Sequence, residues 1–410
     1  MRAFTIVVAI VLGAGCAARP AKVATPASVA GEKVIELEPL RIDVVTTPEG
    51  GQTSHVYDAR SLLDDGNEAL VLRRYDDALA AYDHLLLDFP ESNLKLYALY
   101  NSGQALEGKH DWPAAAEKYT RLIDTIPDTP ESAEQRKNAH FRAAAVLAEA
   151  GRFEPSVRML ERLLDRDDLS AEERLEGLAR LGFAHVEMKD FTGGEDILRQ
   201  AVAYHREVQG TTRLESSYFV AMAQFYLAEI PHQQFLAIPI RYPEEQMHKD
   251  AEAKSQLFLL ARDRYVKAVE YKNPIWATAA VYQVATMYKE FWDQWMAVPI
   301  PADFNPAEAK EYIKQVNEEP QLRHLLEKAL FFHEKNVAMA RDARVSTGWS
   351  EQSDNDAETI RTTLARIEKG DYVKPGTVAA VPSLTPPGPT PDESATQRPP
   401  DVYIPPRLDL

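Results

Sequence analysis

Hydrophobic and small residues recur along the first half of the chain at spacings typical of paired amphipathic helices. Leu62, Gly66 and Ala69 fall on one face of a first expected helix, and Ala78 and Tyr82 fall on one face of a second. Because residues three and four apart share a helix face, this pattern predicts a helical hairpin. A proline eight residues after Tyr82 ends the second helix.

The pattern returns at a fixed distance. The positions Gly66, Ala78, Tyr82 and Pro90 recur 37 residues later as Gly103, Ala115, Tyr119 and Pro127. This resembles the tetratricopeptide repeat (TPR), which has small residues where its two helices cross, an aromatic beside them and a closing proline. Two weaker units, around Phe153 and Phe191, lack that proline. Four TPR-like units thus fill residues 57–208, and a stacked solenoid acts through a binding surface.

Residues 209–370 keep a helical pattern but depart from the repeat. We expect long, divergent helical hairpins that continue and cap the solenoid. Their helices are predicted over residues 214–230, 244–271, 274–296, from 305 onward, 321–344 and 354–370, with Pro231 ending the first and Gly370 closing the last. The predicted fold is all-α, a right-handed superhelical solenoid of TPR-like helical hairpins with a disordered N-terminal tether and a Pro-rich C-terminal tail.

The N-terminus indicates export. Arg2 precedes an apolar run too short to span a bilayer, so residues 1–15 are typical of a signal peptide. Cys16, the only cysteine, follows small residues and resembles the acylated cysteine of a bacterial lipoprotein box, although Gly13 stands where such a box usually has leucine. Within that class, Ala17 favours the outer membrane. The alternative is ordinary signal cleavage beside an incidental cysteine.

Two flanking segments have their own patterns. Residues 16–56 are interpreted as a lipidated tether, in which apolar residues nearly alternate from Val34 to Val45. That alternation predicts a short strand offered to a partner sheet, or else an extended arm on the solenoid. Residues 371–410 contain ten prolines and are predicted to be a disordered tail. Tyr403 and Ile404 within it are an alternative docking peptide.

Composition narrows the classes of partner. The formal net charge of −17 argues against nucleic acid and against adsorption of the body onto anionic lipid, because both need a basic surface. An acidic groove would favour basic or neutral partner segments, although acidity is also common solvating surface. The membrane would be contacted only through acylated Cys16. Without a second cysteine, helix packing must supply the stability.

Motifs for catalysis or metal binding are not found. His324 and His333 are nine residues apart, which is not the spacing of a metalloprotease site. Asp165 and Asp167 begin a calcium-loop template, but Leu169 and Ser170 stand where an oxygen ligand and a glycine are required. We therefore predict no metal, no cofactor and no enzymatic activity.

Two groups of residues are predicted to bind partners. First helices of TPR units usually line the groove, which makes polar side chains there candidates; the alternative is that they are simply solvated. Aromatic residues beside the proline-containing loops 235–243 and 299–304 are candidates for an interface, with core packing as the alternative. The predicted partner-binding residues are Asn67, Asn101, Gln104, Asn138, Tyr288, Phe291, Trp292 and Trp295.

The layout as a whole also carries a resemblance. The runs 242–246 (YPEEQ) and 273–279 (NPIWATA) are similar to runs in TPR envelope lipoproteins of deltaproteobacteria, among them those of myxobacterial gliding motility. This implies an outer-membrane-anchored, periplasm-facing adaptor that binds peptide or helix segments of envelope proteins in a trans-envelope complex. The alternatives are an assembly factor for outer-membrane barrels or secretins, and a regulator of peptidoglycan synthesis.

Overall fold

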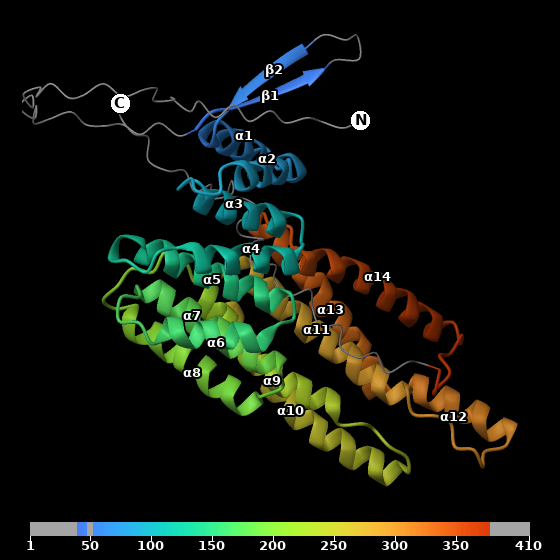
Figure 1. Cartoon of the computed structure of the whole chain (residues 1–410). Helices are drawn as coiled ribbons and strands as arrows, with labels where there is room; N and C mark the ends of the chain where they lie inside the picture. Colours follow the sequence, from blue (N-terminus) through green and yellow to red (C-terminus); the bar gives the residue numbers. More distant parts are fainter. Residues whose placement is uncertain (1–38, 47–51, 378–410) are drawn as a thin grey trace, which may run out of the picture. The chain divides into compact units, whose positions relative to one another are not determined.

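The computed structural model describes residues 39–46 and 52–377 (Figure 1). Cys16, Tyr403 and Ile404 lie outside the described residues. Within them the chain forms fourteen α-helices and one two-stranded β-hairpin, which confirms the predicted all-α class. The helices belong to two compact units, one ending at Asp111 and one beginning at Trp112.

The first unit contains the hairpin and three helices. Strand β1 (Arg41–Thr46) pairs antiparallel with β2 (Gln52–Tyr57), and Ile42 lies opposite Val56. Helices α1 (Ala59–Val71), α2 (Tyr75–Asp88) and α3 (Lys95–Gly108) follow. The strand predicted within residues 34–45 therefore exists in part, but it pairs with the chain's own next segment, so this stretch is not a simple tether.

The first helical hairpin shows why the repeat needs its small residue. A Cβ atom on Gly66 would lie only 2.4 Å from Cε1 of the Tyr82 ring, which is fully buried. The fourth unit keeps the same arrangement with a smaller partner, because a Cβ on Gly182 would lie 2.5 Å from Cδ2 of Leu198. Glycine on one helix and a bulky side chain on the other thus permit the close helix crossing.

The second unit is a series of helices in which each from α4 to α11 packs on the next, and α13 packs on both α12 and α14. Helix α7 also packs on α9, and α11 packs on both α13 and α14. The helices are α4 (Trp112–Thr125), α5 (Ala133–Glu149), α6 (Phe153–Leu164), α7 (Ala171–Glu187), α8 (Phe191–Val208), α9 (Tyr218–Ala237), α10 (Glu244–Glu270), α11 (Pro274–Met296), α12 (Pro306–Glu318), α13 (Pro320–Ala343) and α14 (Gly348–Glu368), with a 3-10 turn at Pro130–Ser132.

Several predicted helix ends are confirmed. Ser170 and Asn305 each form a capping box with the glutamate three residues later, at the starts of α7 and α12. Gly370 adopts a φ of +77° just after α14, a backbone conformation that favours glycine. These signals involve residues within one helical turn, so the sequence alone was sufficient to find them.

Two predicted boundaries are wrong. Pro231 lies inside α9, which continues to Ala237. Every residue of α9 from Val220 to His232 is buried, so packing on all sides holds the helix together across the hydrogen bond that proline cannot make. Helix α14 begins at Gly348 instead of 354, because Thr347 caps it with a side-chain hydrogen bond to the Ser350 N–H.

The folded body also extends beyond Gly370. Asn317 exchanges two hydrogen bonds with the Val373 backbone, donating to its carbonyl at 2.8 Å and accepting from its N–H at 2.9 Å. The Gly376 N–H donates to the Met296 carbonyl at 2.8 Å. Residues 371–377 therefore belong to the second unit and not to the predicted tail.

Candidate functional site

The predicted polar residues of the first helices have different surroundings. Asn67 and Asn101 are buried, and Oδ1 of Asn67 accepts hydrogen bonds from the Tyr82 hydroxyl at 2.9 Å and from Nδ2 of Asn101 at 2.8 Å. Both asparagines therefore have a structural role that links α1, α2 and α3. Gln104 is also buried, whereas Asn138 is exposed on α5. That any of the four contacts a partner stays a prediction.

The predicted aromatic residues pack into the core of the second unit. Trp292 is buried with Met296, Leu326 and Ile360. Tyr288 is half-buried, and its ring lies 5.6 Å from that of Phe332 in a stacked arrangement. These contacts favour the core interpretation for this pair.

The remaining two predicted aromatics lie near the proline-containing loops. Phe291 and Trp295 are half-buried against a small cluster in which Ile240 and Val298 meet. This cluster brings together the flanks of the proline-containing loops 235–243 and 299–304. A partner contact through Trp295 stays a prediction.

The candidate site is a groove in the second unit that we did not predict residue by residue. It has a volume of about 670 Å³ and opens between residues of α5, α7 and α9, with Trp349 contributed by α14. Its apolar lining is dominated by aromatic side chains, namely Phe153, Phe183, Phe191, Phe225, Tyr226 and Trp349. The charged side chains that line it are Glu149, Glu187, Glu229 and Lys189.

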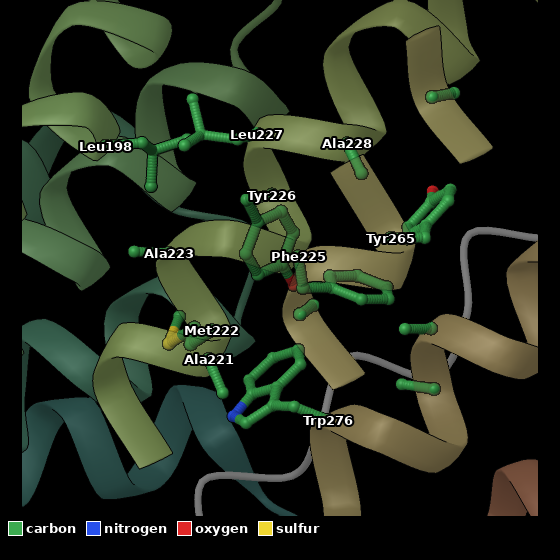
Figure 2. Packing of buried hydrophobic residues seen from close by; sticks show 14 of the residues in the cluster. Leu198, Ala221, Met222, Ala223, Phe225, Tyr226, Leu227, Ala228, Tyr265 and Trp276 are labelled. Carbon is green, nitrogen blue, oxygen red and sulfur yellow. The ribbon is translucent and has the colours of Figure 1, made fainter. Parts of the chain in front are cut away.

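The floor of the groove is part of the main hydrophobic core. The Phe183 ring lies 4.6 Å from that of Tyr226 and 6.0 Å from that of Phe153, measured between ring centroids. Tyr226 and Phe225 in turn contact the fully buried ring of Trp276, at 5.8 and 5.1 Å (Figure 2). The aromatic surface is therefore held rigidly from behind and needs little rearrangement to receive a ligand.

Glu229 is the carboxylate with the most elaborate support. Its Oε1 accepts hydrogen bonds from the Tyr265 hydroxyl at 2.5 Å and from Nε2 of Gln283 at 2.7 Å. Both donors are neutral, so the charge of Glu229 is solvated but not cancelled by them. Oε2 of Glu229 has no hydrogen-bond partner among the described residues.

A buried histidine completes this network. Nε2 of His232 lies 2.8 Å from a carboxylate oxygen of Glu290, and Nδ1 lies 3.0 Å from the Tyr265 oxygen. Because the single hydroxyl proton of Tyr265 goes to Glu229, Nδ1 must donate, and Nε2 donates to the carboxylate. With Glu290 ionised, this arrangement of donors corresponds to an imidazolium. Burial by itself would lower the pKa of His232, but Glu290 and then Glu229 raise it above its ordinary value.

Glu187 lies on α7 with no such support. It is half-buried, and no hydrogen bond or ion pair joins its carboxylate to another described residue. Burial raises its pKa, the nearby charge of Lys189 opposes that shift and the charge of Glu229 adds to it. Nζ of Lys189 itself is exposed and donates to Oε1 of Gln233 at 2.8 Å.

One signal in the sequence leads to these carboxylates. Glu149, Glu187 and Glu229 lie on the first helices of three successive hairpins, 38 and 42 residues apart. This is the spacing of the repeat itself, so a column of glutamates along one side of the stack was visible in the sequence. The small and aromatic consensus positions of the repeat report packing, whereas these glutamates report binding.

Residues 39–46 and 52–377 contain no group of three or more His, Cys, Asp or Glu side chains arranged to hold a metal ion. In the same residues, no helix combines the length and the apolar character that crossing a bilayer requires.

Comparison with known proteins gives likenesses in fold only. No family model matches the sequence, and no curated protein matches it. Among solved structures, the apo form of RapI is similar at 12% identity and a TM-score of 0.40, covering 76% of this chain and 99% of that one. A Rap protein complexed with Competence and Sporulation Factor matches at 14% and 0.37, covering 75% and 76% of the two chains.

A tetratricopeptide repeat protein from Parabacteroides merdae matches at 11% identity and a TM-score of 0.36, covering 74% of this chain and 98% of that one. These scores mark loose agreement. The fold of this chain, all-α and built from TPR-like helical hairpins, follows from its own helices and close crossings, and its function is inferred from its own groove.

Proposed function

We propose that the protein is a non-catalytic scaffold of the cell envelope that binds a segment of another envelope protein in this groove. The observation that carries the proposal is an open groove of about 670 Å³ with a preformed aromatic floor. Aromatic surfaces fixed by a core are frequent anchors for binding, because little conformational entropy is lost when a ligand covers them.

The chemistry of the groove supports binding over catalysis. Its lining combines six aromatic rings with carboxylates, amides and one lysine. The lining residues include no serine, threonine, cysteine or histidine that would pair as nucleophile and base. An open trough that crosses successive helical hairpins suits an extended or helical protein segment better than a compact metabolite.

A photo-crosslinking amino acid at Gln234 is expected to capture the partner in intact cells. Gln234 is an exposed residue of the groove, whereas Gln256 is exposed on α10 and does not line it. Purification under denaturing conditions and mass spectrometry should give a defined envelope protein from position 234 and none from position 256. Adducts of equal yield at both positions, or none at position 234, would refute the proposal.

The identity of the captured protein separates the candidate functions. Components of a motility complex would support a trans-envelope adaptor, in line with the resemblance to deltaproteobacterial envelope lipoproteins. Barrel-assembly or secretin proteins would support an assembly factor, and peptidoglycan synthases would support a regulator of cell-wall synthesis.

We further propose that acylation of Cys16 anchors this scaffold to the outer membrane, with the folded body facing the periplasm. The support is the sequence pattern around Cys16 alone. Several acyl chains on one cysteine hold a protein stably, whereas one chain holds it only weakly.

Replacing Cys16 by serine is expected to move the protein from the membrane to the soluble fraction, because serine cannot receive the thioether-linked lipid. Fractionation followed by immunoblotting measures this. Ala24→Ser, a few residues further on, is the matched control and should stay with the membrane. If the Cys16→Ser protein is retained on membranes as well as the control, the lipoprotein proposal fails.

A further inference from the structure

Two carboxylates of the groove, Glu187 and Glu229, are incompletely paired within the described part of the protein. Glu187 makes no hydrogen bond or ion pair among the described residues, and Oε2 of Glu229 makes none either. A partly desolvated carboxylate without a counterion is unfavourable, and an approaching cation relieves that cost. The negative charge of the groove is therefore not fully neutralised until a cationic ligand binds.

Nearby cations are engaged elsewhere. Arg180 pairs with Glu176 at 2.7 Å and lies over the Phe219 ring, and its charge also interacts with that of Glu149. Lys189 is directed to Gln233. His232 is hydrogen-bonded to Glu290 and Tyr265, and its Nδ1 lies 4.0 Å from Oε1 of Glu229, leaving Oε2 of Glu229 open. Glu187 thus forms no ion pair among the described residues and Oε2 of Glu229 accepts no hydrogen bond there, so the groove lining holds three glutamates and one lysine.

The aromatic residues of the groove indicate which apolar groups a cationic ligand would carry beside its charge. Phe153, Phe183 and Phe191 are half-buried, so each presents part of its ring to the groove. Such rings accept apolar side chains, and their faces also attract guanidinium and ammonium groups. Carboxylates and rings alternate here among successive hairpins, which matches a segment whose side chains alternate in the same way.

We propose that the groove binds a partner segment in which lysine or arginine alternates with apolar residues. The basic groups pair with Glu187 and Glu229, and the apolar groups cover the wall formed by Phe153, Phe183 and Phe191. This inference rests on the proposed function and names the chemistry of the segment that the scaffold holds.

Fluorescence anisotropy with the full-length protein in detergent tests the inference. The probe is a short labelled peptide in which lysine alternates with leucine, compared with the same peptide carrying glutamine for lysine. The Glu187→Gln/Glu229→Gln protein is expected to bind the lysine peptide at least tenfold more weakly than the wild type, since each charge-assisted contact contributes about tenfold. The glutamine peptide should bind both proteins weakly and equally.

A charge-matched control separates site binding from general attraction to a protein of net charge −17. Glu252 and Glu270 are exposed on α10 and do not line the groove. Glu252→Gln/Glu270→Gln should leave the affinity for the lysine peptide within about twofold. An equal loss in both double variants would overturn the inference, and so would displacement of the peptide by spermidine as effective as displacement by unlabelled peptide.

Folding is controlled by the single substitution Glu187→Gln. Its carboxylate supports no internal hydrogen bond, so this variant should unfold at the wild-type temperature and still lose affinity for the lysine peptide; unchanged affinity would count against the inference. A specific crosslink at Gln234 together with lysine-peptide binding that is insensitive to Glu187 and Glu229 would overturn this inference alone. Absence of that crosslink would refute the proposed function itself.

Discussion

Trp276→Ala is expected to lower the free energy of unfolding of the second unit by about 3–5 kcal/mol. The Trp276 side chain is fully buried. Its ring lies within 6 Å of those of Tyr218, Phe225 and Tyr226, measured between centroids. Alanine would lose this burial and leave a cavity under the floor of the groove, which the rigid neighbouring helices cannot close.

Urea unfolding followed by far-UV circular dichroism measures this effect, and two variants calibrate it. Trp276→Phe should cost less, because it keeps an aromatic ring and removes an indole N–H that has no hydrogen-bond partner among the described residues. Leu259→Ala alters a side chain on α10 that is 47% exposed and should stay within about 0.5 kcal/mol of the wild type. A Trp276→Ala protein as stable as the Leu259→Ala protein would contradict the described core.

The stability of the second unit is expected to rise between about pH 8 and pH 10.5 through a single buried lysine. Nζ of Lys254 donates to the carbonyls of Phe235 and Ile238 at the end of α9, and it lies 4.0 Å from the centroid of the Phe235 ring. The side chain is fully buried. Burial lowers the pKa of Lys254 to about 8 from an ordinary value of 10.5, against the charges of Glu290 and Asp250, which raise it.

The sign of the effect follows from proton counting. Between the two pKa values the unfolded chain holds a proton on Lys254 that the folded protein has released, so raising the pH favours the folded state. The contribution is complete above pH 10.5 and is lost as the pH falls through 8. A shift of this size corresponds to on the order of 3 kcal/mol.

Chemical denaturation of the wild type and of Lys254→Met at a series of pH values across this window isolates the contribution of Lys254 to stability. Methionine removes two hydrogen bonds at every pH, which lowers the stability by a constant amount. Only the pH dependence of the difference in unfolding free energy between the two proteins therefore reports the titration of Lys254. We expect the wild type to gain stability relative to Lys254→Met as the pH rises. Lys267→Met, exposed on the same helix, serves as the control and should show a constant difference. A constant difference for Lys254→Met as well would argue against a depressed pKa.

The site was only partly predictable. The repeat correctly indicated that function lies on a surface built by helical hairpins, but Asn67 and Asn101, selected by analogy with groove positions, make an internal polar link. Trp292, selected for its exposed-interface chemistry, is buried. In each case the spacing of residues predicts the helix face, whereas the neighbour that covers this face is distant in the chain.

What the sequence by itself determined is local or periodic. Some features depend only on contacts within one hairpin or one helical turn, where spacing determines geometry. They are the glycine that leaves room for the Tyr82 ring, the capping boxes of α7 and α12, and the turn at Gly370. Tertiary structure decided the rest. Pro231 is accommodated in α9 only because neighbouring helices bury it, and β1 has a strand to pair with only because β2 folds back on it.

The groove depends on tertiary structure more than any other feature described above. Glu229 is oriented by Tyr265 and Gln283, and Glu290, 2.8 Å from His232, raises the pKa of that histidine, although these partners are 36 to 58 residues distant in the chain. Burial and pairing determine the pKa of a carboxylate and which of its oxygens still lacks a hydrogen-bond donor. Both arise only when separate helices pack together. Periodicity could therefore place the glutamates in one column, but only the packed helices show which of them lack a counterion.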